Sequence, residues 1–241
     1  MSASKTVIVT GASQGIGAAV ANLFLERGYN VVANSRNISK KHELLRSDNL
    51  ALVDGDIALD TTAEKLVATA VQRFGAVDAL VNNAGIFISK PFTDYTTEDF
   101  RALSSTNLDG FLFITQRVIK QLLAQKSGGS VVSVTASIAD HPIATLPASV
   151  AMITKGGINA ISKSLALEYA KDGIRVNAVA PGVVATPLLA KVPKDFLRTL
   201  SPSGQIGESK DIADAVLYLS EAGQVTGEIL HVNGGSHVGQ W

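Results

Sequence analysis

The sequence predicts an α/β fold in which a parallel sheet is covered by helices on both faces. Short apolar runs of strand length alternate with helical stretches along most of the 241 residues. A glycine-rich turn from Thr10 to Gly17 joins the first apolar run to the first helical stretch. Polar residues follow several of the apolar runs, at the sheet edge where open parallel sheets bind ligands.

Seven apolar runs are expected to form strands, at residues 7–9, 30–34, 50–54, 77–82, 130–134, 175–179 and 229–232. Helices are expected at about 18–25, 61–74, 97–126, 149–172 and 210–220, with the third bent or interrupted near 107–110. Helices between successive strands imply right-handed crossovers and a parallel sheet. No repeat or linker divides the chain, so residues 1–241 are predicted to form a single domain.

The longest stretch without a periodic pattern runs from about 187 to 207 and contains three prolines. We expect a lid or substrate loop there, and a plain surface excursion is the alternative. Apolar residues in and near this stretch indicate either a pocket wall for a medium-sized apolar substrate or ordinary packing. These residues are Ile143, Leu146, Val183, Val184, Leu188, Leu189, Val192 and Phe196.

The composition narrows the class of protein. Hydrophobic residues make up 46% of the chain and charged residues 17%, which favours a packed core over disorder. Lys plus Arg and Asp plus Glu both number 21, so neither nucleic acid nor an anionic membrane is an expected partner. The chain has no cysteine, no apolar run long enough to span a membrane, and no room for a signal peptide before the first strand. A soluble cytoplasmic protein without a metal site is expected.

The glycine turn has a physical reason for each glycine. Gly11 permits a sharp turn, Gly15 allows a ligand to approach the backbone, and Gly17 allows the helix to pack on the strand. The amide groups at the start of the following helix then face an anion. The polar residues expected near the same sheet edge are Asn34 to Arg36, Asp56, Asn82 and Asn83, Ser137 and Asn177.

These residues together resemble the short-chain dehydrogenase/reductase family over nearly the whole chain. Its landmarks here are the Thr10–Gly17 turn, Asp56-Ile57, Asn82-Asn83-Ala84-Gly85, Asn107, Ser137, Lys155, Asn177, Pro181-Gly182 with Thr186, Thr226-Gly227 and Val232-Asn233-Gly234-Gly235. The resemblance implies a doubly wound, single-domain Rossmann fold with about seven strands. It also implies a nicotinamide dinucleotide cofactor and a homotetramer or homodimer.

The resemblance assigns cofactor roles by position. The glycine turn would hold the diphosphate, Asp56 and Ile57 would bracket the adenine, and Thr186 would hydrogen-bond the nicotinamide carboxamide. The full predicted set is Gly11, Ser13, Gln14, Gly15, Ile16, Gly17, Asn34, Ser35, Arg36, Asp56, Ile57, Asn83, Ala84, Gly85, Lys155, Pro181, Gly182 and Thr186.

The cofactor is expected to be NADP rather than NAD. Ser35 stands where NAD-preferring members of the family carry Asp, and Arg36 follows it. Arg36 could pair with a 2′-phosphate through charge-assisted hydrogen bonds, with Asn34 and Ser35 as neutral donors. Gln14 stands where some NADP-using relatives have a second basic residue. Alternatively, Arg36 is an ordinary surface arginine.

The predicted catalytic residues are Ser137, Lys155 and Asn107. The family pairs such a lysine with a tyrosine four residues earlier, which donates the proton to the carbonyl oxygen. Here that position is Ala151, which has no proton to donate. The residues between them, Met152 to Thr154, are bulkier than the family's usual pattern, which favours natural divergence over an engineered change.

Two functions follow from this departure. The first is an NADP(H)-dependent oxidoreductase that reduces a carbonyl or oxidises an alcohol, and that is impaired or atypical because the tyrosine is absent. It would be slow, or Lys155 or His141 would supply the proton. The second is a non-catalytic NADP-binding subunit or regulator. The retention of Ser137, which contributes little to cofactor binding, favours the first.

Overall fold

The computed structural model describes residues 4–239, which form one seven-stranded parallel sheet in the order β3-β2-β1-β4-β5-β6-β7. This confirms the predicted doubly wound α/β class. The chain order reverses between β1 and β4, and open sheets of this type bind ligands outside the strand ends at that point. The strands are β1 (Thr6–Thr10), β2 (Asn30–Ser35), β3 (Leu50–Asp54), β4 (Ala79–Asn82), β5 (Gly129–Val134), β6 (Ile174–Pro181) and β7 (Ile229–Val232).

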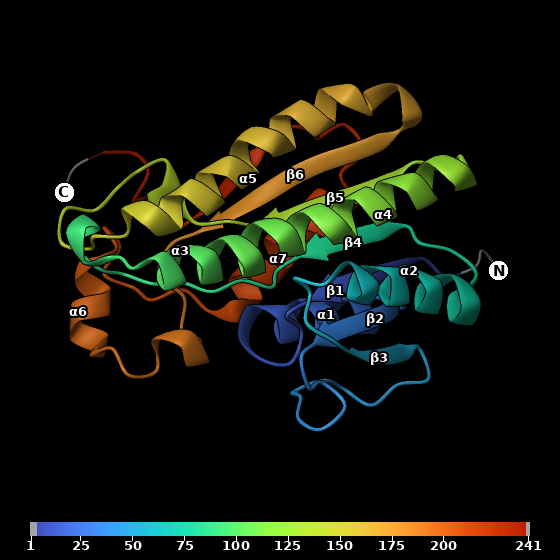
Figure 1. The fold of residues 1–241 in the computed structure, drawn as a ribbon, viewed down its shortest axis with the longest axis horizontal. Helices are drawn as coiled ribbons and strands as arrows, with labels where there is room; N and C mark the ends of the chain where they lie inside the picture. The colour runs from blue at the N-terminus through green and yellow to red at the C-terminus, as the bar shows by residue number, and fades with distance from the viewer. Residues whose placement is uncertain (1–3, 240–241) are drawn as a thin grey trace.

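Helices cover both faces of the sheet, as Figure 1 shows. Alternate residues of β1 point to opposite faces, so Val9 packs in the core under α1 and α7, while Ile8 packs in the core under α2 and α4. The helices are α1 (Gly15–Glu26), α2 (Asp60–Phe74), α3 (Thr97–Ser104), α4 (Gly110–Gln125), α5 (Ser149–Glu168), α6 (Lys194–Thr199) and α7 (Ser209–Glu221).

The helix expected over 97–126 is interrupted where the sequence indicated. A capping box between Thr96 and Asp99 starts α3, and a π-helical turn over Ser105–Asp109 separates α3 from α4. Such turns inside helices are often found at functional sites. Here the π turn brings the side chain of Asn107 to the backbone of Ile86, just past the end of β4.

The segment from 187 to 207 is more regular than expected. It contains a short 3-10 helix, Pro187–Leu189, and the helix α6. Leu197 and Leu200 are buried, and Ala185 donates a backbone hydrogen bond of 2.8 Å to Gly207 that closes the base of the segment. The segment therefore has more secondary structure than its sequence indicated, because apolar residues three apart give one helical turn a buried face. Its role as a lid or substrate loop stays a prediction.

Asn177 does not lie at the end of a strand, as the sequence suggested. It is fully buried inside β6, which is longer than predicted. Its side chain accepts from the Glu228 amide at 3.0 Å and donates to the Val225 carbonyl at 2.9 Å. Asn177 therefore ties β6 to the turn before β7 and does not reach the ligand edge.

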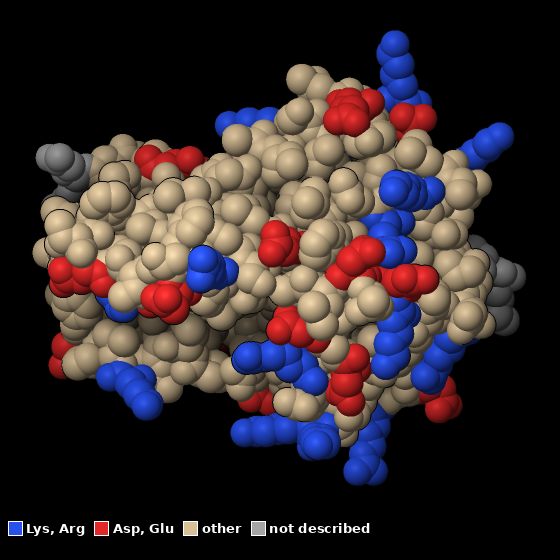
Figure 2. Space-filling model, viewed as in Figure 1, with Lys and Arg blue, Asp and Glu red and all other residues tan. Residues whose placement is uncertain are grey.

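Charge is unevenly distributed over the face shown in Figure 2. Lys, Arg, Asp and Glu side chains gather on the half that carries α2 and the β2 and β3 loops, and the half near α6 is mostly uncharged. The surface is hollowed between these halves. Within residues 4–239, no helix is long and apolar enough to cross a membrane.

Candidate active site

The glycine turn between β1 and α1 cannot accept larger residues at two positions. A Cβ at Gly11 would lie 2.8 Å from the Cα of Ala84, and the Gly11 φ is +65°. A Cβ at Gly17 would collide with the Gly11 carbonyl oxygen. Glycine is therefore required at both positions because the turn packs closely on itself, on Asn83 and on Ala84. Such a turn at a helix start suits a phosphate.

Asn83 braces this turn from the end of β4. Its amide group donates to the carbonyl oxygens of Thr10 at 3.0 Å and Gly11 at 3.1 Å. The Thr10 hydroxyl in turn accepts from the backbone amides of Asn83 and Ala84 at 3.1 Å each. Asn83 thus shapes the turn, and both of its amide hydrogens are used within the protein.

Thr186 lies beside the glycine turn although the two are far apart in sequence. A Cβ at Gly15 would sit 3.5 Å from the side chains of Thr186 and Pro187. Pro181 and Gly182 approach from the end of β6, where the Gly182 amide donates to the Val232 carbonyl at 3.0 Å. The residues expected to meet the diphosphate and the nicotinamide are therefore brought together at one sheet edge.

The residues predicted to meet the adenosine end of the cofactor differ in their exposure and in whether their side chains are already hydrogen-bonded within the protein. Asn34 is buried and donates to the carbonyl oxygens of Val53 at 3.0 Å and Gly55 at 3.1 Å, so its amide has no hydrogen left for a phosphate. Arg36 is exposed and forms no ion pair within residues 4–239. Asp56 is exposed too, and the neighbouring Ile57 is buried.

Lys155 lies at the ends of β4 and β5. Its Nζ donates to the Val134 carbonyl oxygen at 2.8 Å. A Cβ at Gly85 would be 3.2 Å from both the Lys155 Nζ and the Asn107 Oδ1, so these two polar atoms face the same point. Loss of solvation by burial lowers the pKa of Lys155 to about 8. An amine with this pKa exchanges protons near neutral pH.

Asn107 connects the π turn to the helix that carries Lys155. Its Oδ1 accepts from the Ile86 amide at 2.9 Å, and its Nδ2 donates to Thr154 Oγ1 at 3.0 Å. The Thr154 hydroxyl donates to the Ala151 carbonyl oxygen at 2.8 Å. Asn107 therefore fixes α5 relative to the end of β4. Its contact on α5 is Thr154, the residue before Lys155.

Ala151 is 1% exposed and lies in a small apolar cluster one helical turn before Lys155. Leu103, Ala148 and Val150 are the other buried members of this cluster. Tyr95, whose position in the sequence gave no hint of this contact, packs against the cluster, but its hydroxyl donates to the Ile88 carbonyl at 2.7 Å. The cluster members themselves offer no side-chain proton donor.

Ser137 is 3% exposed, and both functions of its hydroxyl are occupied. Its Oγ donates to the Ala180 carbonyl at 2.9 Å and accepts from Asn233 Nδ2 at 2.7 Å. The Asn233 Oδ1 lies 3.0 Å from His237 Nδ1. The sequence marks Asn233 as a landmark of the resemblance but did not predict its contact with Ser137, which spans 96 residues.

Three imidazole rings gather beside this network. His231 and His237 stack with ring centroids 4.3 Å apart, and His141 lies 5.4 and 5.8 Å from them. Burial, and then the two neighbouring imidazoles, lower the pKa of His231. Within residues 4–239 no group of His, Asp or Glu side chains is arranged to hold a metal ion.

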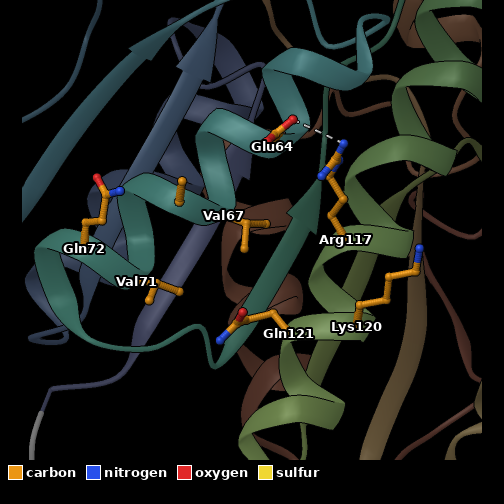
Figure 3. Close-up of a pocket in the computed structure, with 8 residues that line it drawn as sticks. Glu64, Val67, Val71, Gln72, Arg117, Lys120 and Gln121 are labelled. Atoms are coloured by element: carbon orange, nitrogen blue, oxygen red, sulfur yellow. Dashed lines mark hydrogen bonds and ion pairs between the residues drawn. The ribbon is translucent and has the colours of Figure 1, made fainter.

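A separate groove of about 420 Å³ lies between α2 and α4, away from the residues above. Val67 and Val71 line one side, Lys120 and Gln121 the other, and Arg117 forms an ion pair with Glu64 across its end (Figure 3). None of the predicted site residues lines it. The candidate active site is therefore the edge formed by the strand ends.

Comparison with known proteins agrees with this fold. Residues 11–237 match a family model described as enoyl-(acyl carrier protein) reductase. Glucose 1-dehydrogenase of Gluconobacter oxydans is 36% identical, over 97% of this chain and 92% of that protein. The NADP-dependent (R)-specific alcohol dehydrogenase of Lentilactobacillus kefiri is 37% identical, over 96% of both.

Solved structures give the same result. The 3-ketoacyl-(acyl-carrier-protein) reductase of Brucella melitensis, complexed with NADH, superimposes with a TM-score of 0.87 at 29% identity, over 98% of this chain and 99% of that one. ElxO with NADP bound superimposes with a TM-score of 0.88 at 28% identity, over 98% and 100%. The chain belongs to the short-chain dehydrogenase/reductase family of oxidoreductases.

Proposed function

We propose that this protein is an NADP(H)-dependent oxidoreductase that interconverts a carbonyl and an alcohol, with Lys155 as the proton donor in place of a tyrosine. The observation that carries the proposal is the position of Lys155 Nζ, at the ends of β4 and β5, together with its lowered pKa. The relatives with NADP-dependent or NADP-bound names support the choice of cofactor.

The residues present fit a nicotinamide dinucleotide. Gly11 and Gly17 permit the tight turn at the start of α1, Thr186 lies beside Gly15, and Arg36 is exposed where it could meet a 2′-phosphate. When bound, the dinucleotide would supply or accept the hydride. A tyrosine-to-phenylalanine variant of ElxO has NADPH bound, so in that relative the substituted tyrosine is dispensable for holding the cofactor.

Lys155 would complete the reduction by donating one proton to the substrate oxygen. As hydride reaches the carbonyl carbon, its oxygen gains negative charge and takes a proton from the Lys155 ammonium group. The product is an alcohol and a neutral amine, which solvent protonates again. A proton donor contributes roughly 100- to 10,000-fold in rate, and a pKa of about 8 suits both directions near neutral pH.

Asn107 and Ser137 would act as positioning residues in this account. Asn107 holds α5 through Thr154 and leaves its Oδ1 facing the region of Lys155. Ser137 donates its hydrogen to Ala180, so it anchors the end of β6 and does not face a substrate oxygen with a free proton. This differs from the catalytic role that the family resemblance implies for Ser137, in which the serine orients the substrate oxygen.

A non-catalytic NADP-binding protein is the second candidate. The apolar surroundings of Ala151 and the occupied hydroxyl of Ser137 favour it, since neither group can donate a proton to a substrate. NADPH oxidation in the presence of a panel of apolar ketones and aldehydes tests the choice. Turnover supports the oxidoreductase, and NADPH binding without turnover supports the second candidate.

A further inference from the structure

A carboxylate from outside the glycine turn accepts a hydrogen bond from one of the backbone amide groups of the turn. The Gly15 amide donates to the Oε2 of Glu43 at 3.3 Å. Gly15 belongs to the turn that is expected to hold the cofactor diphosphate, and an amide group at a helix start ordinarily attracts an anion. The protein therefore places its own negative charge at the position where the cofactor brings another.

The backbone around Glu43 is firmly attached to the turn and to α1. The Glu43 amide donates to the Ser13 carbonyl at 3.0 Å, and the Glu43 carbonyl accepts from Asn22 Nδ2 at 3.0 Å. Asn22 Oδ1 also accepts from the Leu45 amide at 2.9 Å, and Leu44 is buried in the core under α1. The Glu43 backbone is thus fixed beside the turn, which keeps the exposed Glu43 side chain within reach of the Gly15 amide.

Glu43 lies at the adenosine end of the predicted site. Its contacts with Ser13 and Gly15 flank Gln14, the position where some NADP-using relatives have a basic residue. The segment that carries Glu43 begins at Arg36, which is expected to meet the 2′-phosphate. One segment between β2 and β3 therefore carries both Arg36, which is expected to meet the 2′-phosphate, and Glu43, which contacts the turn expected to hold the diphosphate.

We propose that Glu43 is a specificity-determining residue that opposes Arg36 and lowers the affinity for the dinucleotide, most strongly for NADPH. This inference rests on the proposed cofactor site. The electrostatic reason is direct, because a carboxylate repels both the diphosphate and the additional 2′-phosphate. Its removal would raise the preference for NADPH over NADH.

The test is a fluorescence titration of NADPH and NADH against the native protein and Glu43→Gln. Glutamine keeps an oxygen that accepts from Gly15 and removes only the charge. For a charge near the surface we expect NADPH to bind roughly two- to five-fold more tightly, NADH to change less, and the difference to shrink at 1 M NaCl.

The matched control is Glu26→Gln. Glu26 is an exposed carboxylate at the other end of α1, about 16 Å from Gly15 by the helix rise. It should leave both dissociation constants unchanged. If Glu43→Gln binds both cofactors with the native dissociation constants, the proposed role of Glu43 is overturned and the proposed function still stands. Failure of the native protein and Glu43→Gln to bind either cofactor would overturn the proposed function itself, and the inference with it.

Discussion

Lys155 donates a hydrogen bond from Nζ to the carbonyl oxygen of Val134 over 2.8 Å, which ties α5 to the end of β5. The same Nζ faces the backbone of Gly85, past the end of β4. One lysine thus spans the strand ends at which a substrate carbonyl would meet the nicotinamide. The predictions below follow from this arrangement and from the contacts of the residues around it.

Ser137→Ala should affect stability more than turnover. It leaves the Ala180 carbonyl and the Asn233 amide without their partner in a buried site, at a cost of about 1 to 3 kcal/mol. Urea unfolding and steady-state kinetics check this. We expect kcat to fall less than ten-fold, and a loss of 100-fold or more with native stability would show that Ser137 acts on the substrate.

Ala151→Tyr should lower the stability of the protein and should not strongly raise its carbonyl reduction. Ala151 is 1% exposed among apolar neighbours, and a phenol ring there requires them to move, at a cost of about 1 to 3 kcal/mol. Thermal unfolding should show a lower Tm than that of the native protein. A large rise in carbonyl reduction with an unchanged Tm would mean that the pocket accepts a tyrosine and that the native chain lacks only its acid.

Gly17→Ala should damage the cofactor turn. The added Cβ collides with the Gly11 carbonyl oxygen, so the turn must open and the NADPH affinity should fall at least ten-fold. Gly156→Ala is the matched control, since a Cβ there meets no atom within 4 Å. Because alanine favours a helix over glycine by about 0.5 to 1 kcal/mol, the control should be as stable as the native protein or slightly more so. Equal NADPH affinity in both variants would contradict the account.

Arg36→Ala should change the cofactor preference. The loss of a charge-assisted contact with the 2′-phosphate should weaken NADPH about 10- to 100-fold and leave NADH nearly unchanged. Titration with both cofactors measures the ratio. Arg27, an exposed arginine at the C-terminal end of α1, provides a control substitution. An unchanged ratio would make Arg36 an ordinary surface arginine.

The sequence was sufficient to predict the sheet, the order of its elements and the interruption of the helix at Asn107. These features depend on local patterns, which are apolar periodicity, glycine spacing and one polar residue inside a helix. The helix α6 was missed, because six residues with three charges show little periodicity. Asn177 was wrongly placed at a strand end, since β6 continues beyond it to Pro181.

The roles of individual polar side chains were harder to predict. Asn34, Asn83 and Ser137 all lie near the expected edge, yet their hydrogen bonds go to backbone atoms or to Asn233. Those partners are 19 to 96 residues away in sequence. The sequence identifies a polar residue near a strand end, and only the fold decides whether its hydrogens are free for a ligand.

The most direct test of the account is the pH dependence of NADPH-dependent carbonyl reduction by the native protein and Lys155→Arg. Reduction needs the protonated lysine, so native kcat should fall as pH rises through about 8, and alcohol oxidation, which needs the neutral amine, should rise over the same range. Arginine keeps the positive charge but cannot release its proton, so its kcat should fall roughly 100- to 10,000-fold with NADPH still bound. Native-like kcat in Lys155→Arg, or a native rate that does not change through pH 8, would contradict the assignment of Lys155 as the proton donor.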